Sequence, residues 1–436
     1  MRVRFLSLGC RVNQYETQAL EGLFSAYGFT VVPNGEADVV VVNSCTVTSA
    51  ADRKSRQALR RMRRESPGAV LVLTGCLPQA SPEAACALPE ADIITGSLDR
   101  ANLICLVQEY LKTRQRQVAI PAFSPGVAFE PLSVDRFDDS FQRAYLKIED
   151  GCDHFCSYCA IPFARGPVRS RSPGEITAEV RRLVTAGYRE IVLTGINLSR
   201  YGSSWGSSLP EAVAACEAVP GDFRIRLGSV EPDLLSPADW DKLACFPRLC
   251  PQFHLALQSG CDETLRRMNR HYTVAEYLET VEGIRRRFSN PSITTDLIAG
   301  FPGETDTEFE TTCRTVEAVG LLRGHVFEYS PRAGTAAASM PGQVPGPLKR
   351  ERAAILSALC RRSGEAFART QVGRRARVLL EATGGGYTDN YLYVQVFPPG
   401  QAAAAGGWLD VLLDRAIETG CHGILFNPNT ESGEGE

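Results

Sequence analysis

The sequence lacks any apolar run long enough to cross a membrane. Its longest apolar runs, such as VVVV at 39–42, fall far short of the roughly 20 residues that a transmembrane helix needs. The first residues, MRVRFLSLGC, also lack the apolar segment and cleavage site of a signal peptide. We therefore expect a cytoplasmic protein with no membrane partner.

The sequence also lacks an excess of positive charge. It has 47 Lys and Arg against 50 Asp and Glu, and its formal net charge is -3. Because nucleic-acid binding depends largely on phosphate neutralisation, such a chain must bind through a local patch. The stretch 53–64, rich in Arg and Lys, is one candidate, and a solvated helical face is its alternative. Arg165, Arg169 and Arg171 form a second candidate patch.

The sequence also lacks the even number of cysteines that a set of disulfide pairs requires. The chain has 15 cysteines, and an odd number in a long chain without a signal peptide argues against a disulfide framework. In a reducing compartment, clustered cysteines are more typical of metal ligands or catalytic groups.

Three segments of different character predict three domains. In residues 1–117, apolar β-branched runs alternate with helical patterns, which predicts an α/β unit with a doubly wound parallel sheet. A linker rich in Pro, Gly, Ser and Asp follows at 118–140. Residues 141–367 hold six strand candidates separated by helices, which predicts an open sheet or a partial (βα)6 barrel. Residues 371–430 change to period-two strands with glycine turns, typical of a small antiparallel β-barrel.

Three cysteines crowd into GCDHFCSYC at 151–159, directly after the first predicted strand of the second segment. In parallel α/β folds the carboxyl ends of the strands carry the chemistry, so this loop lies where an active site is expected. Three thiolates could hold three irons of a 4Fe–4S cluster and leave the fourth iron open to a substrate. Structural zinc on Cys152, Cys156, Cys159 and His154 is the main alternative, and incidental free cysteines are another.

Three further cysteines are distant in sequence but share a structural position. Cys10, Cys45 and Cys76 each end a predicted parallel strand, so their thiols can converge at one edge of the sheet. A glycine or serine precedes each of them and leaves room for a bulky inorganic group. The set could hold a second cluster with an open iron, and coincidence is the alternative, since strand ends tolerate cysteine.

The C-x3-C-x2-C loop resembles that of the radical S-adenosylmethionine superfamily, and the two cysteine sets followed by a small β-barrel resemble the methylthiotransferases. The motifs that carry the resemblance are LGCRVNQYET (8–17), VNSCTVT (42–48), LTGC (73–76), GCDHFCSYCAIPFARGPVRSR (151–171), TGINLSRYG (194–202), RLGSVEP (226–232), LQSGCDETLRRMNRHYT (257–273), TDLIAGFPGETDTEF (295–309) and FEYSPRAGTAA (327–337). VNQYET, TGINLSRYG and YSPRAGT resemble in particular the branch that acts on tRNA.

This resemblance implies an enzyme that inserts a methylthio group at C2 of N6-threonylcarbamoyladenosine 37, beside the anticodon of tRNA. The loop cysteines would hold the cluster that reductively cleaves S-adenosylmethionine, and the strand-end cysteines a second 4Fe–4S cluster that holds the sulfur. The anticodon stem-loop would be the partner, and reduced flavodoxin or ferredoxin the electron donor. The alternatives are the enzymes that modify isopentenyladenosine 37 of tRNA or a ribosomal-protein aspartate. A non-catalytic iron–sulfur electron carrier or RNA-binding protein is the alternative of another class.

Polar residues at the ends of the barrel strands are candidates for contact with S-adenosylmethionine. They are Thr194, Asn197, Glu231, Gln258, Ser259 and Asp296. For each of them, a packing or turn role is the alternative.

The C-terminal segment resembles the TRAM domain, an RNA-binding module, through VLLEATGGGYTDNYLYVQV. Residues 371–436 hold only four basic residues against eight acidic ones, which argues against a strong electrostatic hold on RNA. Tyr387, Tyr391 and Tyr393 could stack on bases, with packing in the sheet as the alternative.

Overall fold

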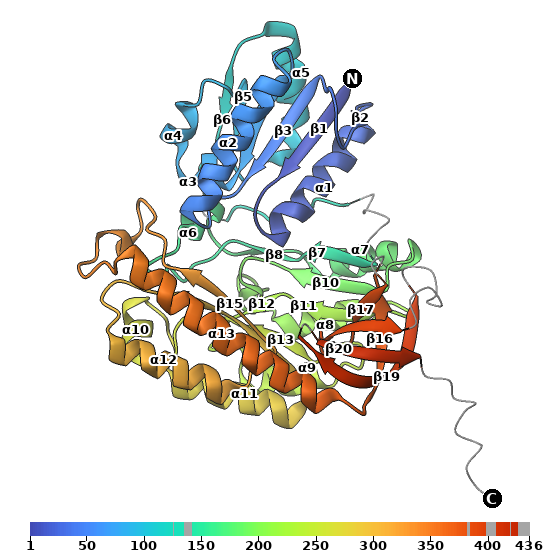
Figure 1. The fold of residues 1–436 in the computed structure, drawn as a ribbon. Coiled ribbons are helices and arrows are strands. Elements are labelled where there is room, and N and C mark those ends of the chain that lie inside the picture. Colours follow the sequence, from blue (N-terminus) through green and yellow to red (C-terminus); the bar gives the residue numbers. More distant parts are fainter. Residues whose placement is uncertain (125, 135–141, 382–383, 398–406, 419, 426–436) are drawn as a thin grey trace, which may run out of the picture.

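The computed structural model describes residues 1–124, 126–134, 142–381, 384–397, 407–418 and 420–425. Figure 1 shows an N-terminal sheet with its helices standing over a larger unit of parallel strands, with a small β-barrel beside that unit. Residues 125 and 135–140 of the expected linker and residues 382–383, 398–406, 419 and 426–430 of the expected 371–430 unit lie outside the described residues. None of the described helices combines the length and apolar character required to span a membrane.

The N-terminal unit is a parallel sheet in the order β2-β1-β3-β4-β5-β6. Its strands are β1 Arg2–Ser7, β2 Thr30–Val31, β3 Val39–Ser44, β4 Val70–Gly75, β5 Ile93–Thr95 and β6 Gln117–Ala119. Its helices are α1 Arg11–Ala26, α2 Ser49–Glu65, α3 Cys76–Ala80, α4 Pro82–Cys86, η1 Arg100–Asn102 and α5 Leu103–Thr113. Helices cover both faces, so neighbouring residues such as Val40 and Val41 belong to hydrophobic clusters on opposite sides. The expected doubly wound sheet is confirmed, and β6 extends it past residue 117.

The central unit has a parallel wall of seven strand segments, and two consecutive segments separated only by Gly228 form the third of the six expected strands. Its strands pair as β7-β10-β11 and β12-β13-β14-β15. A bridge between Ile225 and Leu249 joins the two groups. The strands are β7 Arg143–Lys147, β8 Glu149–Asp150, β9 Arg169–Ser170, β10 Glu190–Thr194, β11 Arg224–Leu227, β12 Ser229–Val230, β13 Gln252–Leu255, β14 Ser292–Ala299 and β15 Arg323–Glu328. The short strands β8 and β9 form a separate antiparallel pair.

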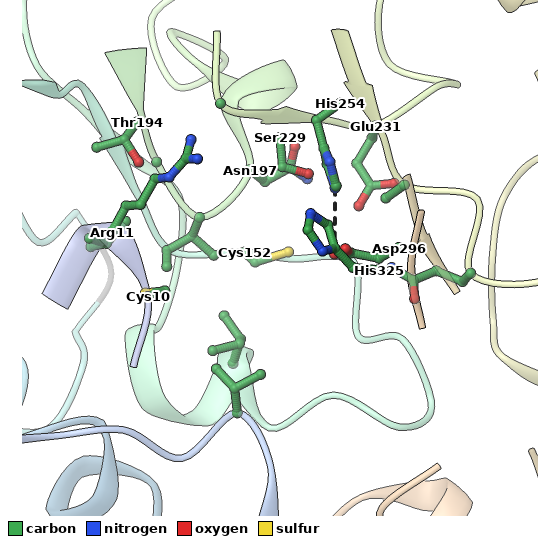
Figure 2. A pocket seen from close by; sticks show the side chains of 18 of the residues that line it. Cys10, Arg11, Cys152, Thr194, Asn197, Ser229, Glu231, His254, Asp296 and His325 are labelled. Atoms are coloured by element: carbon green, nitrogen blue, oxygen red, sulfur yellow. Dashed lines mark ion pairs between the residues drawn. The ribbon is translucent and has the colours of Figure 1, made fainter. Parts of the chain in front are cut away.

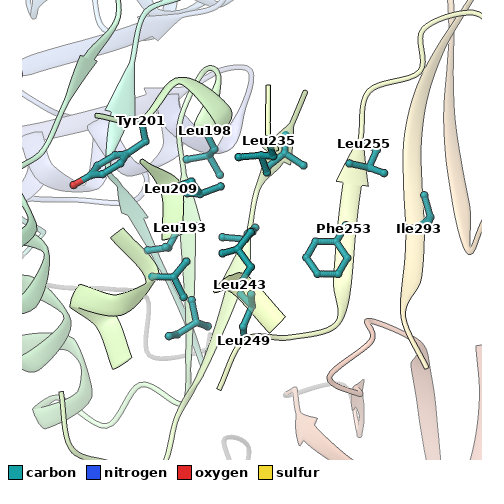
Figure 3. Close-up of a cluster of buried hydrophobic side chains, with 14 of the residues drawn as sticks. Leu193, Leu198, Tyr201, Leu209, Leu235, Leu243, Leu249, Phe253, Leu255 and Ile293 are labelled. Atoms are coloured by element: carbon teal, nitrogen blue, oxygen red, sulfur yellow. The ribbon is translucent and has the colours of Figure 1, made fainter. Parts of the chain in front are cut away.

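Helices connect these strands and cover the wall. They are α6 Ile161–Arg165, α7 Pro173–Thr185, η2 Leu198–Arg200, α8 Leu209–Glu217, α9 Pro237–Ala244, α10 Asp262–Arg267, α11 Val274–Arg287, α12 Asp306–Val319, η3 Ala336–Ser339 and α13 Gly346–Gln371. Capping boxes explain where α7, α9, α11 and α12 begin, because a Ser or Thr and an acidic residue satisfy the free N–H groups. Figure 3 shows the core between strands and helices, with Leu193, Leu243 and Phe253 among its side chains.

The C-terminal unit is a closed barrel in the order β16-β17-β18-β20-β19. Its strands are β16 Arg375–Leu380, β17 Gly385–Tyr387, β18 Tyr393–Phe397, β19 Trp408–Ile417 and β20 Gly420–Leu425. The expectation of a purely antiparallel barrel is wrong in one place, because β18 and β20 run parallel. Strand directions cannot alternate all the way round an odd-numbered ring, so one parallel pair is unavoidable.

Arginines of the central unit attach this barrel. Arg226 donates hydrogen bonds to the carbonyl oxygen of Asp389 at 2.9 Å, and the Arg143 guanidinium lies 4.6 Å from the centre of the Tyr387 ring. The rings of Tyr387 and Tyr391 stack with their centres 4.6 Å apart. These two tyrosines therefore pack at the interface between the units, which is the packing alternative rather than base stacking.

Candidate functional site

A cavity of about 520 Å³ lies where the N-terminal unit meets the carboxyl ends of the central strands. Four cysteines line it: Cys10 from the N-terminal unit and Cys152, Cys156 and Cys159 from the central unit. Five of the six candidate polar residues line it as well, namely Thr194, Asn197, Glu231, Gln258 and Asp296. Figure 2 shows Cys10 and Cys152 on the same space, with polar side chains of the strand ends around them.

Ser259, the sixth candidate, lies elsewhere. Its side chain is buried, and its hydroxyl is 3.2 Å from the hydroxyl of Thr312 on α12. The structure therefore places Ser259 in the packing between strand and helix and not in the cavity lining.

The loop with the three cysteines is shaped by its backbone. The N–H of Cys159 donates to the carbonyl oxygen of Cys156 at 2.9 Å. Gly151 before the loop has a φ of +93°, and a Cβ there would lie 2.1 Å from the Pro167 carbonyl oxygen. Only glycine fits this position, so the chain can turn sharply out of β8 and present Cys152 to the cavity.

Two of the loop thiols, those of Cys152 and Cys159, are buried enough to favour the protonated form without a metal. Burial raises the pKa of Cys152 to about 11 and that of Cys159 to about 12. A guanidinium N–H of Arg270 lies 3.3 Å from the Cys156 sulfur, and the same side chain is ion-paired with Glu231. A metal centre bound here must displace protons, because thiolates and not thiols are ligands.

The structure brings the three strand-end cysteines together around the start of α1. The sulfurs of Cys10 and Cys76 lie 3.9 and 3.8 Å from the side-chain oxygen of Asn13. A Cβ at Gly9, where φ is +101°, would lie 2.6 Å from the sulfur of Cys45. Burial raises the pKa of Cys76 to about 12. The convergence inferred from parallel strand ends is therefore present in the fold.

Arg165, at the end of α6, connects the two cysteine sets. Its side chain is fully buried, and its guanidinium lies 3.3 Å from the Cys76 sulfur and 2.5 Å from the Asn13 side-chain oxygen. It also pairs with Glu16 at 2.5 Å and with Asp150 at 3.5 Å. One side chain of the central unit thus reaches the cysteines of the N-terminal unit.

The prediction that Arg165, Arg169 and Arg171 form a surface patch for RNA is wrong. Arg165, Arg169 and Arg171 are 0%, 4% and 2% exposed, so none of them can meet a phosphate. Arg169 pairs with Asp150 at 3.0 Å, and Arg171 donates to the Leu132 carbonyl oxygen at 2.6 Å. These arginines form ion pairs with buried carboxylates and donate hydrogen bonds to carbonyl oxygens between the units. Their spacing in the sequence does not reveal this role.

Asn197 is held with its side chain unpaired. Glu149 accepts hydrogen bonds from the N–H groups of Ile196 and Asn197 at 2.8 and 2.7 Å. Burial raises the pKa of Glu149 well above its usual range. The Asn197 amide is 4% exposed, and neither its nitrogen nor its oxygen has a partner among the described residues. A buried amide without a partner in a cavity wall fits a polar ligand.

Two of the remaining candidates, Gln258 and Asp296, belong to the opposite wall. Gln258 has a φ of +62°, which is uncommon for a residue with a Cβ. Its N–H donates to the carbonyl oxygen of Asp296 at 2.9 Å. The Asp296 carboxylate lies 3.5 Å from the His254 ring, as the dashed line in Figure 2 marks. Thr194 ends β10 on the other side of the cavity.

His154 is oriented away from the zinc alternative. Among the described residues, its ligand atom comes within 4.8 Å of those of Asp233 and His271. Its ring centre lies 5.1 Å from that of His271. The structure therefore groups His154 with these two residues and not with the three loop thiols.

Several cavity residues were not found from the sequence. They are Arg11, His254, Arg270, Arg323 and His325. One property could have pointed to some of them: the chain has only five histidines, and three of these line the cavity. Arg11 directly follows a cysteine that was already a candidate.

Two family models match the chain. Residues 146–316 match the radical SAM superfamily, and residues 2–96 match an uncharacterized protein family, UPF0004. The first match contains the loop cysteines and the second contains the strand-end cysteines. A radical SAM domain implies a 4Fe–4S cluster and S-adenosylmethionine.

Relatives match nearly the whole chain. The chain is 37% identical to the threonylcarbamoyladenosine tRNA methylthiotransferase MtaB of Thermotoga maritima, over 87% of this chain and 86% of that protein. It is 36% identical to the protein of the same name from Bacillus subtilis, over 90% and 89%. It is 34% identical to the tRNA-2-methylthio-N(6)-dimethylallyladenosine synthase of Anaplasma marginale, over 87% and 84%.

Solved structures share the fold. The radical S-adenosylmethionine methyltransferase TsrM from Kitasatospora setae superimposes with a TM-score of 0.57 at 16% identity, over 77% of each chain. At this identity the likeness concerns the fold alone.

Proposed function

The chain belongs to the radical S-adenosylmethionine methylthiotransferases, and we propose that it attaches a methylthio group to C2 of N6-threonylcarbamoyladenosine 37 in tRNA. One observation carries the proposal: Cys10 and the loop cysteines line the same cavity. Sulfur insertion needs the activated cofactor and the sulfur source to reach one carbon atom. Two cysteine sets on one cavity provide that arrangement, and the MtaB relatives supply the substrate.

In this proposal each cysteine set holds one 4Fe–4S cluster. The loop set is Cys152, Cys156 and Cys159, and the strand-end set is Cys10, Cys45 and Cys76. Bound there, the clusters supply the electron that cleaves S-adenosylmethionine and the sulfur that is inserted. Three ligands in each set leave one iron open. The glycine before each cluster-binding turn supports this fit, because a side chain at Gly9 or Gly151 would fill the space the turn needs.

Two buried arginines stabilise the ligand charge. Arg270 donates toward the Cys156 sulfur and Arg165 toward the Cys76 sulfur, each at 3.3 Å. Hydrogen bonds to ligating sulfur disperse negative charge and tune a metal centre. One such donor lies beside each set and would disperse the charge of the thiolates once a cluster is bound.

The polar wall of the cavity would orient S-adenosylmethionine. Asn197 offers a buried amide without a partner among the described residues, and Glu149 accepts the two backbone hydrogen bonds that fix the turn presenting it. Thr194, Glu231, Gln258 and Asp296 complete this set of proposed contacts. Ser259 is the weakest proposal, since Thr312 already satisfies its hydroxyl.

The exposed face of α2 would contact the anticodon stem-loop. Four of its cations have no ion-pair partner among the described residues: Arg53, Lys54, Arg56 and Arg64. The helix starts shortly after Cys45, and Arg53, Lys54 and Arg56 lie in its first half, whereas Arg64 lies in its last turn. Reduced flavodoxin or ferredoxin is the proposed electron donor, and the cytoplasm, where tRNA is modified, the proposed location.

Cysteine variants test the proposal. Cys156→Ala should abolish formation of 5′-deoxyadenosine from S-adenosylmethionine. Cys45→Ala should still cleave S-adenosylmethionine but yield no methylthio nucleoside. Cys105→Ala is the matched control, because Cys105 is an exposed cysteine on α5. Methylthio product formed by Cys45→Ala at the wild-type rate would remove the second cluster from the mechanism.

Nucleoside analysis tests the substrate. In a strain that lacks the gene and has no redundant enzyme, mass spectrometry of digested tRNA should show no 2-methylthio-N6-threonylcarbamoyladenosine. Persistence of that nucleoside would exclude the proposed substrate, and loss of the isopentenyl analogue would identify the other tRNA branch.

A further inference from the structure

Arg11 is a cation of the cavity that has no carboxylate partner among the residues the structure describes. It is the first residue of α1, directly after Cys10, and it lines the cavity. Figure 2 shows its side chain extending from α1 toward Thr194. Its guanidinium lies 5.5 Å from the centre of the Tyr145 ring, and no described carboxylate forms an ion pair with it. The side chain is exposed to the cavity and free to bind an anion.

The carboxylates of the cavity do not neutralise Arg11. Two of them line it, and each has another partner: Glu231 pairs with Arg270, and Asp296 with His254. The positive charge of Arg11 therefore extends across the cavity. Burial lowers the pKa of His325 on the opposite wall, and the charge of Arg11 adds to that effect.

We propose that Arg11 binds the carboxylate of the threonylcarbamoyl substituent and so selects this nucleotide. The inference rests on the function proposed above. N6 is joined to C2 of adenine through C6 and N1 alone, so the substituent begins close to the reacting carbon. C2 must approach the sulfur source that Cys10 helps to hold, and Arg11 is the next residue in the chain. A planar guanidinium matches a carboxylate with two parallel hydrogen bonds.

The other cavity arginines are less suited to this task. Arg270 already pairs with Glu231 and contacts the Cys156 sulfur. Arg323 begins β15, so it lies at the end of the parallel wall opposite to the cysteine loop. The dimethylallyl group of the other tRNA branch is an uncharged hydrocarbon, and a lone guanidinium offers it nothing in return for its own desolvation.

A comparison of two RNA ligands tests the proposal. The ligands are anticodon stem-loops that carry N6-threonylcarbamoyladenosine or its neutral carboxamide, in which only the carboxylate is replaced. Their affinities for the cluster-loaded full chain are measured by fluorescence anisotropy without S-adenosylmethionine. The wild type should prefer the carboxylate by about tenfold to a hundredfold, the value of a charge-assisted hydrogen-bonded pair. The preference should vanish in Arg11→Gln and survive in part in Arg11→Lys, which keeps the charge but not the fork.

Arg114→Gln is the matched control, since Arg114 also lies over a tyrosine ring, that of Tyr110, but outside the cavity lining. It should keep the wild-type preference. An Arg11→Gln protein that folds normally and still prefers the carboxylate as the wild type does would overturn the role of Arg11 alone. A wild type that shows no preference and forms no methylthio product from the carboxylate RNA would overturn the proposed substrate and the inference together.

Discussion

Replacement of Glu16 by glutamine should strongly destabilise the contact between the N-terminal and central units. Glu16 lies on α1 and is fully buried. Three cations surround its carboxylate: Arg100 at 2.9 Å, Lys147 at 2.7 Å and Arg165 at 2.5 Å. Two of these come from the central unit. The amide of Gln keeps the shape of the side chain but leaves three buried cations without this counter-charge.

The expected cost is large. Removal of one partner from a buried ion pair costs about 3–5 kcal/mol. Burial alone would raise the pKa of Glu16. The charges of Arg100, Arg165 and Lys147 outweigh burial and lower this pKa from 4.5 to about 2. Through proton linkage this shift corresponds to about 3 kcal/mol of stability. For a unit of this size, such a loss lowers the melting temperature by roughly 6 to 20 °C.

Thermal denaturation at neutral pH checks the prediction. Glu21→Gln is the matched control on the same helix, because the described residues place no cation on its carboxylate, and its melting temperature should change little. Equal melting temperatures for the two variants would refute the reasoning.

The same reasoning predicts a pH dependence. Because the pKa of Glu16 is lower in the folded chain, the unfolded chain binds more protons, and stability falls as pH falls from about 4.5 toward about 2. The gap between wild type and Glu16→Gln should therefore narrow over this range.

Two further substitutions have clear expected outcomes. Two 4Fe–4S clusters hold about eight iron atoms per chain, and Gly9→Ala should halve this number. The added Cβ would lie 2.6 Å from the Cys45 sulfur and so disturb one of the two sites. An unchanged iron content in a colorimetric assay would contradict a cluster at the strand-end cysteines. Simultaneous replacement of the four unpaired α2 cations by Gln should weaken binding of the anticodon stem-loop and reduce its salt dependence by about one unit of slope for each lost phosphate contact. Arg60→Gln, whose cation is paired with Glu90, is the control for the second experiment, and an unchanged slope in the fourfold variant would leave α2 as a solvated face.

The sequence was sufficient for the features that depend on local periodicity. Buried β-branched runs predict the parallel strands of the N-terminal unit, and the rule that parallel strands end at one edge predicts that Cys10, Cys45 and Cys76 converge. The six-stranded wall of the central unit follows from the same alternation of strand and helix. These predictions succeed because neighbouring residues decide them.

Ion pairs between residues far apart in the chain could not be predicted from local sequence patterns. Arg165, Arg169 and Arg171 look like a solvent-exposed basic stretch, because arginine is seldom buried without a partner. The partners of two of them are distant: Glu16 is separated from Arg165 by 149 positions, and Tyr15 from Arg171 by 156. The sequence predicted antiparallel strands for the C-terminal barrel but not its one parallel pair, β18 and β20, which follows from the closure of five strands into one ring.

The buried charges between the two units are better explained by alignment than by stability. A hydrophobic interface of equal size would hold the units together at least as well, because buried ions lose their hydration. Ion pairs and hydrogen bonds, however, are satisfied in one relative position only. Arg165 follows the cysteine loop on α6 and ends on the Cys76 sulfur, so any slip between the units breaks its contacts with Glu16 and Asn13. Transfer of sulfur to a carbon activated from the other side tolerates little such slip. The network therefore keeps the two cysteine sets in register across the cavity.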